Sequence, residues 1–118
     1  MSQLIGNLIT IQQQIRVFHW QTKSFAQHEA FGKTYETLDG LVDEFVEVYL
    51  GKSQGRIRED KLSISLSVNV EPIEFIGHCI EYLIEFNNVF EQSDSDLLNL
   101  RDEMLAAMNK LKYLLTLQ

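Results

Sequence analysis

The chain has one cysteine, little positive charge and no long apolar run, and each scarcity excludes a class of protein. Cys79 has no partner for an internal disulfide, which indicates a reducing compartment. Ten Lys and Arg against seventeen Asp and Glu give a net charge of −7, the wrong sign for holding a phosphate backbone. The longest apolar run is residues 104–108, far short of the ~20 residues of a membrane span. We therefore expect a soluble, cytoplasmic protein that binds neither DNA nor a membrane.

The rest of the sequence repeats at helical spacing within what we take as one domain, residues 1–118. A first helix is predicted over residues 2–23. Ser24 and Gln27 have the spacing of a capping box, so a second helix should begin near residue 25 and end near Leu50, where Gly51 follows.

Two further helices are predicted in the second half. Pro72 suits the first position of a third helix. Ser93 with Asp96 offers the cap of a fourth, which begins its apolar stripe at Leu97. The fold class is therefore all-α.

Residues 52–70 connect the second and third helices and have a different pattern. Polar and apolar residues alternate over residues 63–70, which is the period of an extended strand. The segment could pair with the same segment of a second copy, or it could be an extended crossover across the bundle. A four-helix bundle with one long connection of this kind is typical of the ferritin-like folds.

Candidate ligands are concentrated on the first two helices. His19 and His28 are nine residues apart, so they share a site only if the chain turns between them. Asp43 and Glu47 are one turn apart on the second helix. Two more acids on the same face are Glu36 and Asp39. Imidazole with carboxylate suits iron, zinc or manganese, whereas an acidic stripe on a helix is more often its solvated face.

The run His19-Trp20-Gln21-Thr22-Lys23, followed by His28, Asp43 and Glu47, resembles the ferroxidase signature of the Dps family, the mini-ferritins. In that family a His-Trp pair ends the first helix and a second His opens the next. An Asp follows fifteen residues after that His, and a Glu follows four residues later. The likeness covers residues 10–51 clearly and residues 72–117 weakly.

The resemblance implies an iron site that two subunits share, within a homodimer or a dodecameric cage. His19 and His28 would come from one subunit, and Asp43 and Glu47 from the other. Ferrous iron would be oxidised there, usually by peroxide, and stored as ferric mineral. Trp20 would lie beside the site as an electron donor or packing wall, or it would be an aromatic anchor between helices.

The sequence also differs from the family's pattern. Gly32 stands four residues after the second His, where the family often has an acid, and the family's basic DNA-binding tail is absent. The connection 52–70 looks extended where the family has a short helix. These differences favour a second hypothesis, a non-enzymatic helical dimer or interaction protein on the same fold with an incomplete metal site.

Overall fold

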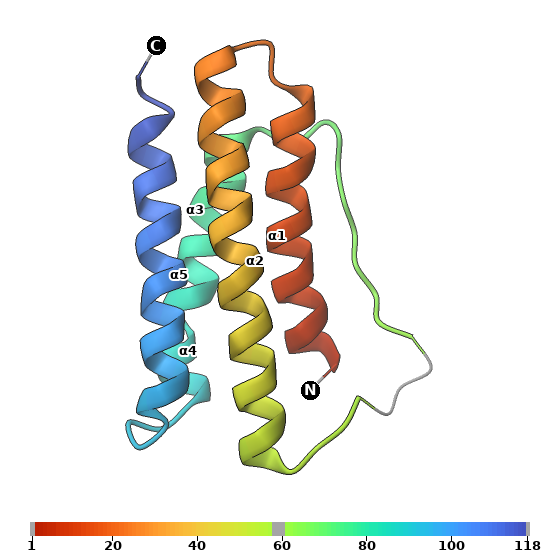
Figure 1. Cartoon of the computed structure of the whole chain (residues 1–118), viewed down its shortest axis with the longest axis vertical. Helices are drawn as coiled ribbons and strands as arrows, with labels where there is room; N and C mark the ends of the chain where they lie inside the picture. Colours follow the sequence, from red (N-terminus) through yellow and green to blue (C-terminus); the bar gives the residue numbers. More distant parts are fainter. Residues whose placement is uncertain (1, 58–60, 118) are drawn as a thin grey trace.

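The computed structural model describes residues 2–57 and 61–117, and every regular element in that part of the chain is helical. The elements are α1 (Ser2–Gln21), α2 (Phe25–Ser53), α3 (Pro72–Ile84), α4 (Phe86–Val89) and α5 (Ser95–Leu114). The four longer helices pack into a compact bundle, and α4 follows α3 after a break at Glu85 (Figure 1). This confirms the predicted all-α class. None of the described helices has the length and hydropathy needed to cross a membrane.

The direction of the helices follows from the long connection between α2 and α3. α1 and α2 are antiparallel neighbours, and the chain after α2 returns to the end of the bundle where α1 finishes (Figure 1). α3 consequently runs in the same direction as α2, and α5 runs antiparallel to both. The predicted connection is therefore present, with residues 58–60 outside the described residues.

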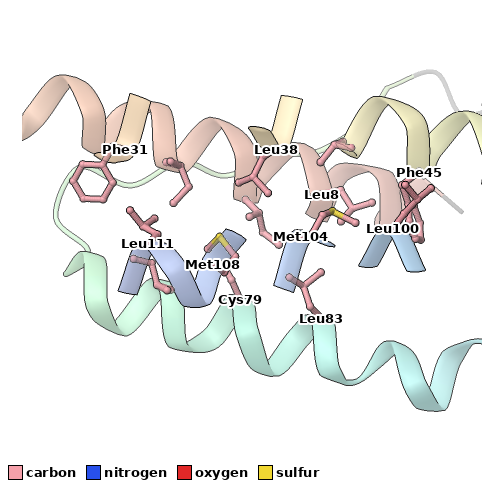
Figure 2. Packing of buried hydrophobic residues seen from close by; sticks show 14 of the residues in the cluster. Leu8, Phe31, Leu38, Phe45, Cys79, Leu83, Leu100, Met104, Met108 and Leu111 are labelled. Atoms are coloured by element: carbon pink, nitrogen blue, oxygen red, sulfur yellow. The ribbon is translucent and has the colours of Figure 1, made fainter. Parts of the chain in front are cut away.

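The core is a layer of apolar side chains from the four long helices (Figure 2). Spacings of three, four and seven residues place them on one face of each helix. Its most buried members, each at most 1% exposed, are Leu8, Ile15, Phe31, Leu38, Phe45, Ile76, Leu83, Leu97, Met104, Met108 and Leu111. Burial also raises the pKa of the Cys79 thiol to about 12, so this side chain is protonated at neutral pH and packs as a small hydrophobe.

The ends of α2 differ partly from the sequence prediction. Ser24 Oγ accepts a hydrogen bond from the Gln27 N–H at 3.2 Å, as the capping box predicts. The Gln27 amide oxygen does not complete the box; it accepts from the Thr22 hydroxyl at 2.8 Å. The prediction that Gly51 ends the helix is wrong. α2 continues to Ser53, because Gln54 itself adopts the left-handed cap conformation, with φ 52°.

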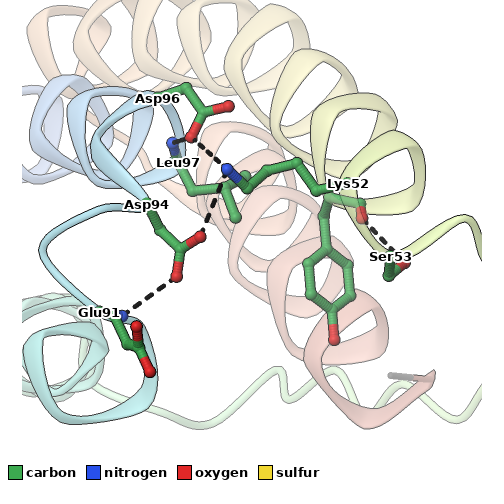
Figure 3. Close-up of polar contacts among 7 residues, drawn as sticks. Lys52, Ser53, Glu91, Asp94, Asp96 and Leu97 are labelled. Carbon is green, nitrogen blue, oxygen red and sulfur yellow. Dashed lines mark hydrogen bonds and ion pairs between the residues drawn. The ribbon is translucent and has the colours of Figure 1, made fainter.

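The start of α5 is tied to the end of α2 by an exposed ion pair (Figure 3). Lys52 Nζ lies 3.0 Å from Asp96 Oδ1 and 3.3 Å from Asp94 Oδ1. The hydrogen bond from Lys52 holds the pKa of the Asp96 carboxyl below its usual value. Asp94 is the N-cap residue of α5, so the predicted cap at Ser93 is displaced by one residue.

A buried arginine fixes the junction between α3 and α4. Arg101 on α5 is 6% exposed and donates to the Leu83 carbonyl oxygen at 2.8 Å and to Asn87 Oδ1 at 2.7 Å. Its third bond, from Nε to Asp102 Oδ1 at 2.8 Å, pairs the charge. All three bonds compensate the cost of burying a guanidinium. They also supply a side-chain donor to the Leu83 carbonyl oxygen in the last turn of α3, where the usual helical N–H donors are missing.

The segment 61–70 is extended but is not a strand; it lies along α1. The Gln14 amide, 1% exposed, pairs with the Ser67 backbone, donating to its carbonyl and accepting from its N–H, both at 2.8 Å. Gln21 donates to the Val68 carbonyl oxygen at 2.9 Å. A Cβ at Gly6 would lie 2.8 Å from the Ser63 carbonyl oxygen, so glycine permits the close approach there. Within one chain the segment is therefore the predicted crossover, and its pairing with a second copy stays a prediction.

Replacement of Gln14 by alanine should release this segment. The variant loses both bonds to Ser67 and leaves a gap in a buried position, so we expect the free energy of unfolding to fall by about 1–3 kcal/mol. Trypsin should also cleave faster after Lys61. Urea unfolding and timed proteolysis measure the two effects. Gln13→Ala, one residue away, is the control; equal behaviour of the two variants would contradict the assigned role of Gln14.

Candidate functional site

The two histidines meet at the turn between α1 and α2. The turn is short because α1 ends at Gln21 and Ser24 caps α2 directly afterwards. The imidazole rings of His19 and His28 stack with centroids 3.8 Å apart and planes 17° apart. The requirement that the chain break between them is therefore met, and both rings are half-buried.

Each imidazole is oriented by the backbone of the other histidine. His19 Nδ1 lies 2.7 Å from the His28 carbonyl oxygen, and His28 Nδ1 lies 2.8 Å from the His19 carbonyl oxygen. A carbonyl only accepts, so both Nδ1 atoms carry the proton and donate. In the neutral rings, the lone pair is then on Nε2. Neither Nε2 atom has a hydrogen-bond partner within residues 2–57 and 61–117. We refer to this reciprocal arrangement as the histidine clamp.

Gly32 is the residue that makes room for the clamp. A Cβ built at Gly32 would lie 2.9 Å from Cε1 and 3.0 Å from Nδ1 of His19. The His19 ring therefore occupies the space that any side chain at position 32 would enter. The clamp gives a physical reason for glycine where the Dps-like pattern has an acid.

Beside the clamp is an exposed aromatic and cationic cluster that sequence reasoning missed. The Arg16 guanidinium lies 4.8 Å from the ring centre of Trp20 and 5.1 Å from that of Tyr35. The spacing of Arg16 and Trp20, one helical turn, was the available signal. Trp20 is 65% exposed, so it does not anchor helices within one chain. Phe25, 77% exposed, also contacts the clamp, with its ring centre 6.3 Å from that of His28.

The acidic candidates lie further along α2 on an exposed face. Asp43 is fifteen residues after His28, which places it about 22 Å away along the helix axis. Glu47 lies one turn beyond Asp43, and both side chains are exposed. Asp39 accepts a hydrogen bond from Gln12 Nε2 at 2.6 Å, and Glu36 is exposed. Within the described part of one chain, no three His, Cys, Asp or Glu side chains converge on a metal position.

One chain therefore holds the candidate ligands in two separate groups, which we call half-sites. The histidine clamp offers the Nε2 atoms of two imidazoles, and an Nδ1–H bond to a carbonyl is the usual way in which a metal-ligating histidine is oriented. Asp43 and Glu47 offer two carboxylates one turn apart. A second copy could bring the two half-sites together; a single copy holds them apart.

Comparison with known proteins gives a family and one curated relative. A family model described as "Family of unknown function (DUF5856)" matches residues 19–115, which include all six candidate ligands. The chain is also similar to the "Uncharacterized 14.6 kDa protein in mobD-ri intergenic region" of Enterobacteria phage T4. The two are 26% identical over 114 residues, covering 97% of this chain and 86% of the phage protein. No solved structure matches significantly.

The close contact at Gly32 predicts that alanine there lowers the free energy of unfolding relative to alanine at another helical glycine. Alanine normally stabilises a helix relative to glycine by about 1 kcal/mol. Gly32→Ala should instead push the His19 ring out of the clamp, and its free energy of unfolding should be about 1–3 kcal/mol below that of Gly77→Ala.

Gly77, in α3, is the matched control because a Cβ there meets nothing within 4 Å. Urea unfolding gives both stabilities, and imidazole NMR resonances report the state of the two rings. Equal gains in stability for both variants, with unchanged His19 resonances, would contradict the close contact.

Proposed function

The chain belongs to DUF5856, a family of unknown function. We therefore propose its function from its own residues. Two copies associate through the exposed face of α1 and α2 and bind ferrous iron between them. His19 and His28 of one copy and Asp43 and Glu47 of the other are the ligands. The iron is oxidised there and stored or detoxified, as in the Dps proteins that the sequence resembles.

The observation that carries this proposal is the histidine clamp. Its Nδ1 atoms are committed to carbonyl oxygens at 2.7 and 2.8 Å, so Nε2 is the nitrogen left for a ligand bond. Orientation by a carbonyl fixes the tautomer before metal binds. Together with carboxylates, such nitrogens form a donor set that suits iron, with zinc or manganese as substitutes.

The distance along α2 supports a shared site between antiparallel copies. If two α2 helices lie antiparallel about a two-fold axis level with Tyr35 and Glu36, His28 of each copy lies level with Asp43 of the other. In a two-fold interface each contact occurs twice, so the dimer would contain two equivalent sites. The exposed Trp20 and Phe25 lie beside the clamp and would be covered. Glu36 and Asp39 lie between the half-sites and offer additional carboxylate ligands.

The chemistry is a one-electron oxidation of each iron ion. Two ferrous ions each lose one electron to hydrogen peroxide, which takes up two protons and becomes two waters. The protein's residues hold the ions and neutralise their charge with Asp43 and Glu47. A ferritin-like bundle and a dodecameric cage follow from the same resemblance and belong to the proposal.

A second candidate is a non-enzymatic dimer or interaction protein. The stacking of the rings at 3.8 Å and their reciprocal bonds favour it, because a clamp that joins α1 to α2 accounts for both histidines without a metal. The two candidates differ in one measurable respect. Only the first requires His28 and Asp43 to act together from different copies.

Paired single variants test the shared site. His28→Ala and Asp43→Ala should each abolish the ferric absorbance that forms from ferrous iron and peroxide. When the two variants are co-expressed with different tags, mixed dimers should recover one intact site, giving about a quarter of the wild-type signal overall.

Glu81→Ala, which removes an exposed acid on α3, is the control and should match the wild type. Wild-type absorbance in either single variant would exclude that residue as a ligand. Inactive single variants whose mixture recovers nothing would exclude sharing between copies. Absence of any ferric signal in the wild type would leave the interaction protein as the function.

A further inference from the structure

A groove follows the seam between α2 and α5, on a face of α2 other than the one that carries the histidine clamp. Its volume is about 590 Å³, and small residues line its middle, among them Gly40 and Ala107. A Cβ at Gly40 would meet nothing within 4 Å, so the described chain leaves the space in front of it open.

Two threonines also line the groove. Thr34 is 7% exposed, and Thr37, one turn along the same helix, donates to the Lys33 carbonyl oxygen at 3.1 Å. The lining therefore contains polar groups in addition to the small residues.

The charges around the groove are divided between its two ends. Because α2 and α5 are antiparallel, Lys33 lies at the same end as Lys110, and Glu44 lies at the same end as Glu103 (Figure 1). All four side chains are exposed. None of them makes an ion pair with a residue in the described ranges. The groove is therefore basic near the α1–α2 turn and acidic at its other end.

We propose that a second copy of this chain docks in this groove about a two-fold axis perpendicular to it. A two-fold axis exchanges the ends, so Lys33 and Lys110 of each copy face Glu44 and Glu103 of the other. The chain itself thus supplies the complementary charge pattern, and Gly40 and Ala107 let the helices approach closely. Two copies related by a translation would not place the groove of one against the groove of the other, so neither set of charges would be paired.

This interface is separate from the proposed iron site. The clamp and Asp43 lie on one side of α2 and the groove lies on another, so both surfaces can be used in one assembly. Two different two-fold axes through one subunit generate an assembly larger than a dimer. The groove interface does not rest on iron binding, and it would remain if the iron proposal failed.

Charge reversal tests the groove directly. The variants Lys33→Glu with Lys110→Glu and Glu44→Lys with Glu103→Lys each place like charges across the axis. Each should raise the dissociation constant at the groove by more than about tenfold and reduce the mass in light scattering by about half. Mixing the two variants, or combining all four substitutions, should restore the wild-type mass.

The control carries the same net charge as the first variant. Lys61→Glu with Lys112→Glu reverses two exposed lysines outside the groove and should keep the wild-type mass. Circular dichroism verifies folding. A monomeric wild type, an unchanged mass in the reversed variants, or a mixture that fails to recover would each overturn the proposal. Docking of a different protein would give the first of these outcomes.

Discussion

The reciprocal contact between His19 and His28 is the constraint on which the geometry of the α1–α2 pair depends. Two imidazole N–H groups and two carbonyl oxygens at 2.7 and 2.8 Å tie the last turn of α1 to the first turn of α2. The carbonyl oxygens at the end of an α-helix lack donors within the helix, and the clamp supplies a donor to the His19 carbonyl oxygen. Gly32 is part of this device, because a side chain there would displace the His19 ring.

The same contact gives a different interpretation of Gly32, which stands where the Dps-like pattern has an acid. On the sequence, Gly32 looks like a ligand that has been lost from a Dps-like site. In the structure, glycine at that position admits the His19 ring, and the His28 carbonyl oxygen fixes the tautomer of that ring. An acid there and this clamp exclude each other for steric reasons. Position 32 therefore holds either an acid, as in the Dps-like pattern, or the glycine that admits the clamp.

Much of the fold could be predicted from the sequence, because helical periodicity records which face of each helix is buried. The turn at Ser24 and the long connection were also predictable, from capping chemistry and a change of period. The extent of α2 was not, because Gln54 takes a left-handed conformation that favours glycine. Nor was the role of Arg101, since its partners Leu83 and Asn87 lie 18 and 14 residues earlier in the sequence.

The candidate site was predictable only in part, because spacing in the sequence determines which residues meet within one chain but not between copies. Residues on either side of a tight turn meet in the same chain, so spacing predicted the meeting of His19 and His28 correctly. Residues on one continuous helix stay apart, and the fifteen residues from His28 to Asp43 correspond to about 22 Å. Whether such half-sites join depends on a second copy, which no spacing within one chain determines.

The length of α2 connects the two proposals. A helix of 29 residues extends beyond the cover that its neighbours in one bundle provide, and it presents separate faces to α1 and to α5. On the α1 side, the ligand half-sites lie at different heights, so only an antiparallel copy brings them level. On the α5 side, the charges are opposite at the two ends, so again only an antiparallel copy matches them. Both proposed contacts therefore use two-fold symmetry, although they involve different residues and different chemistry.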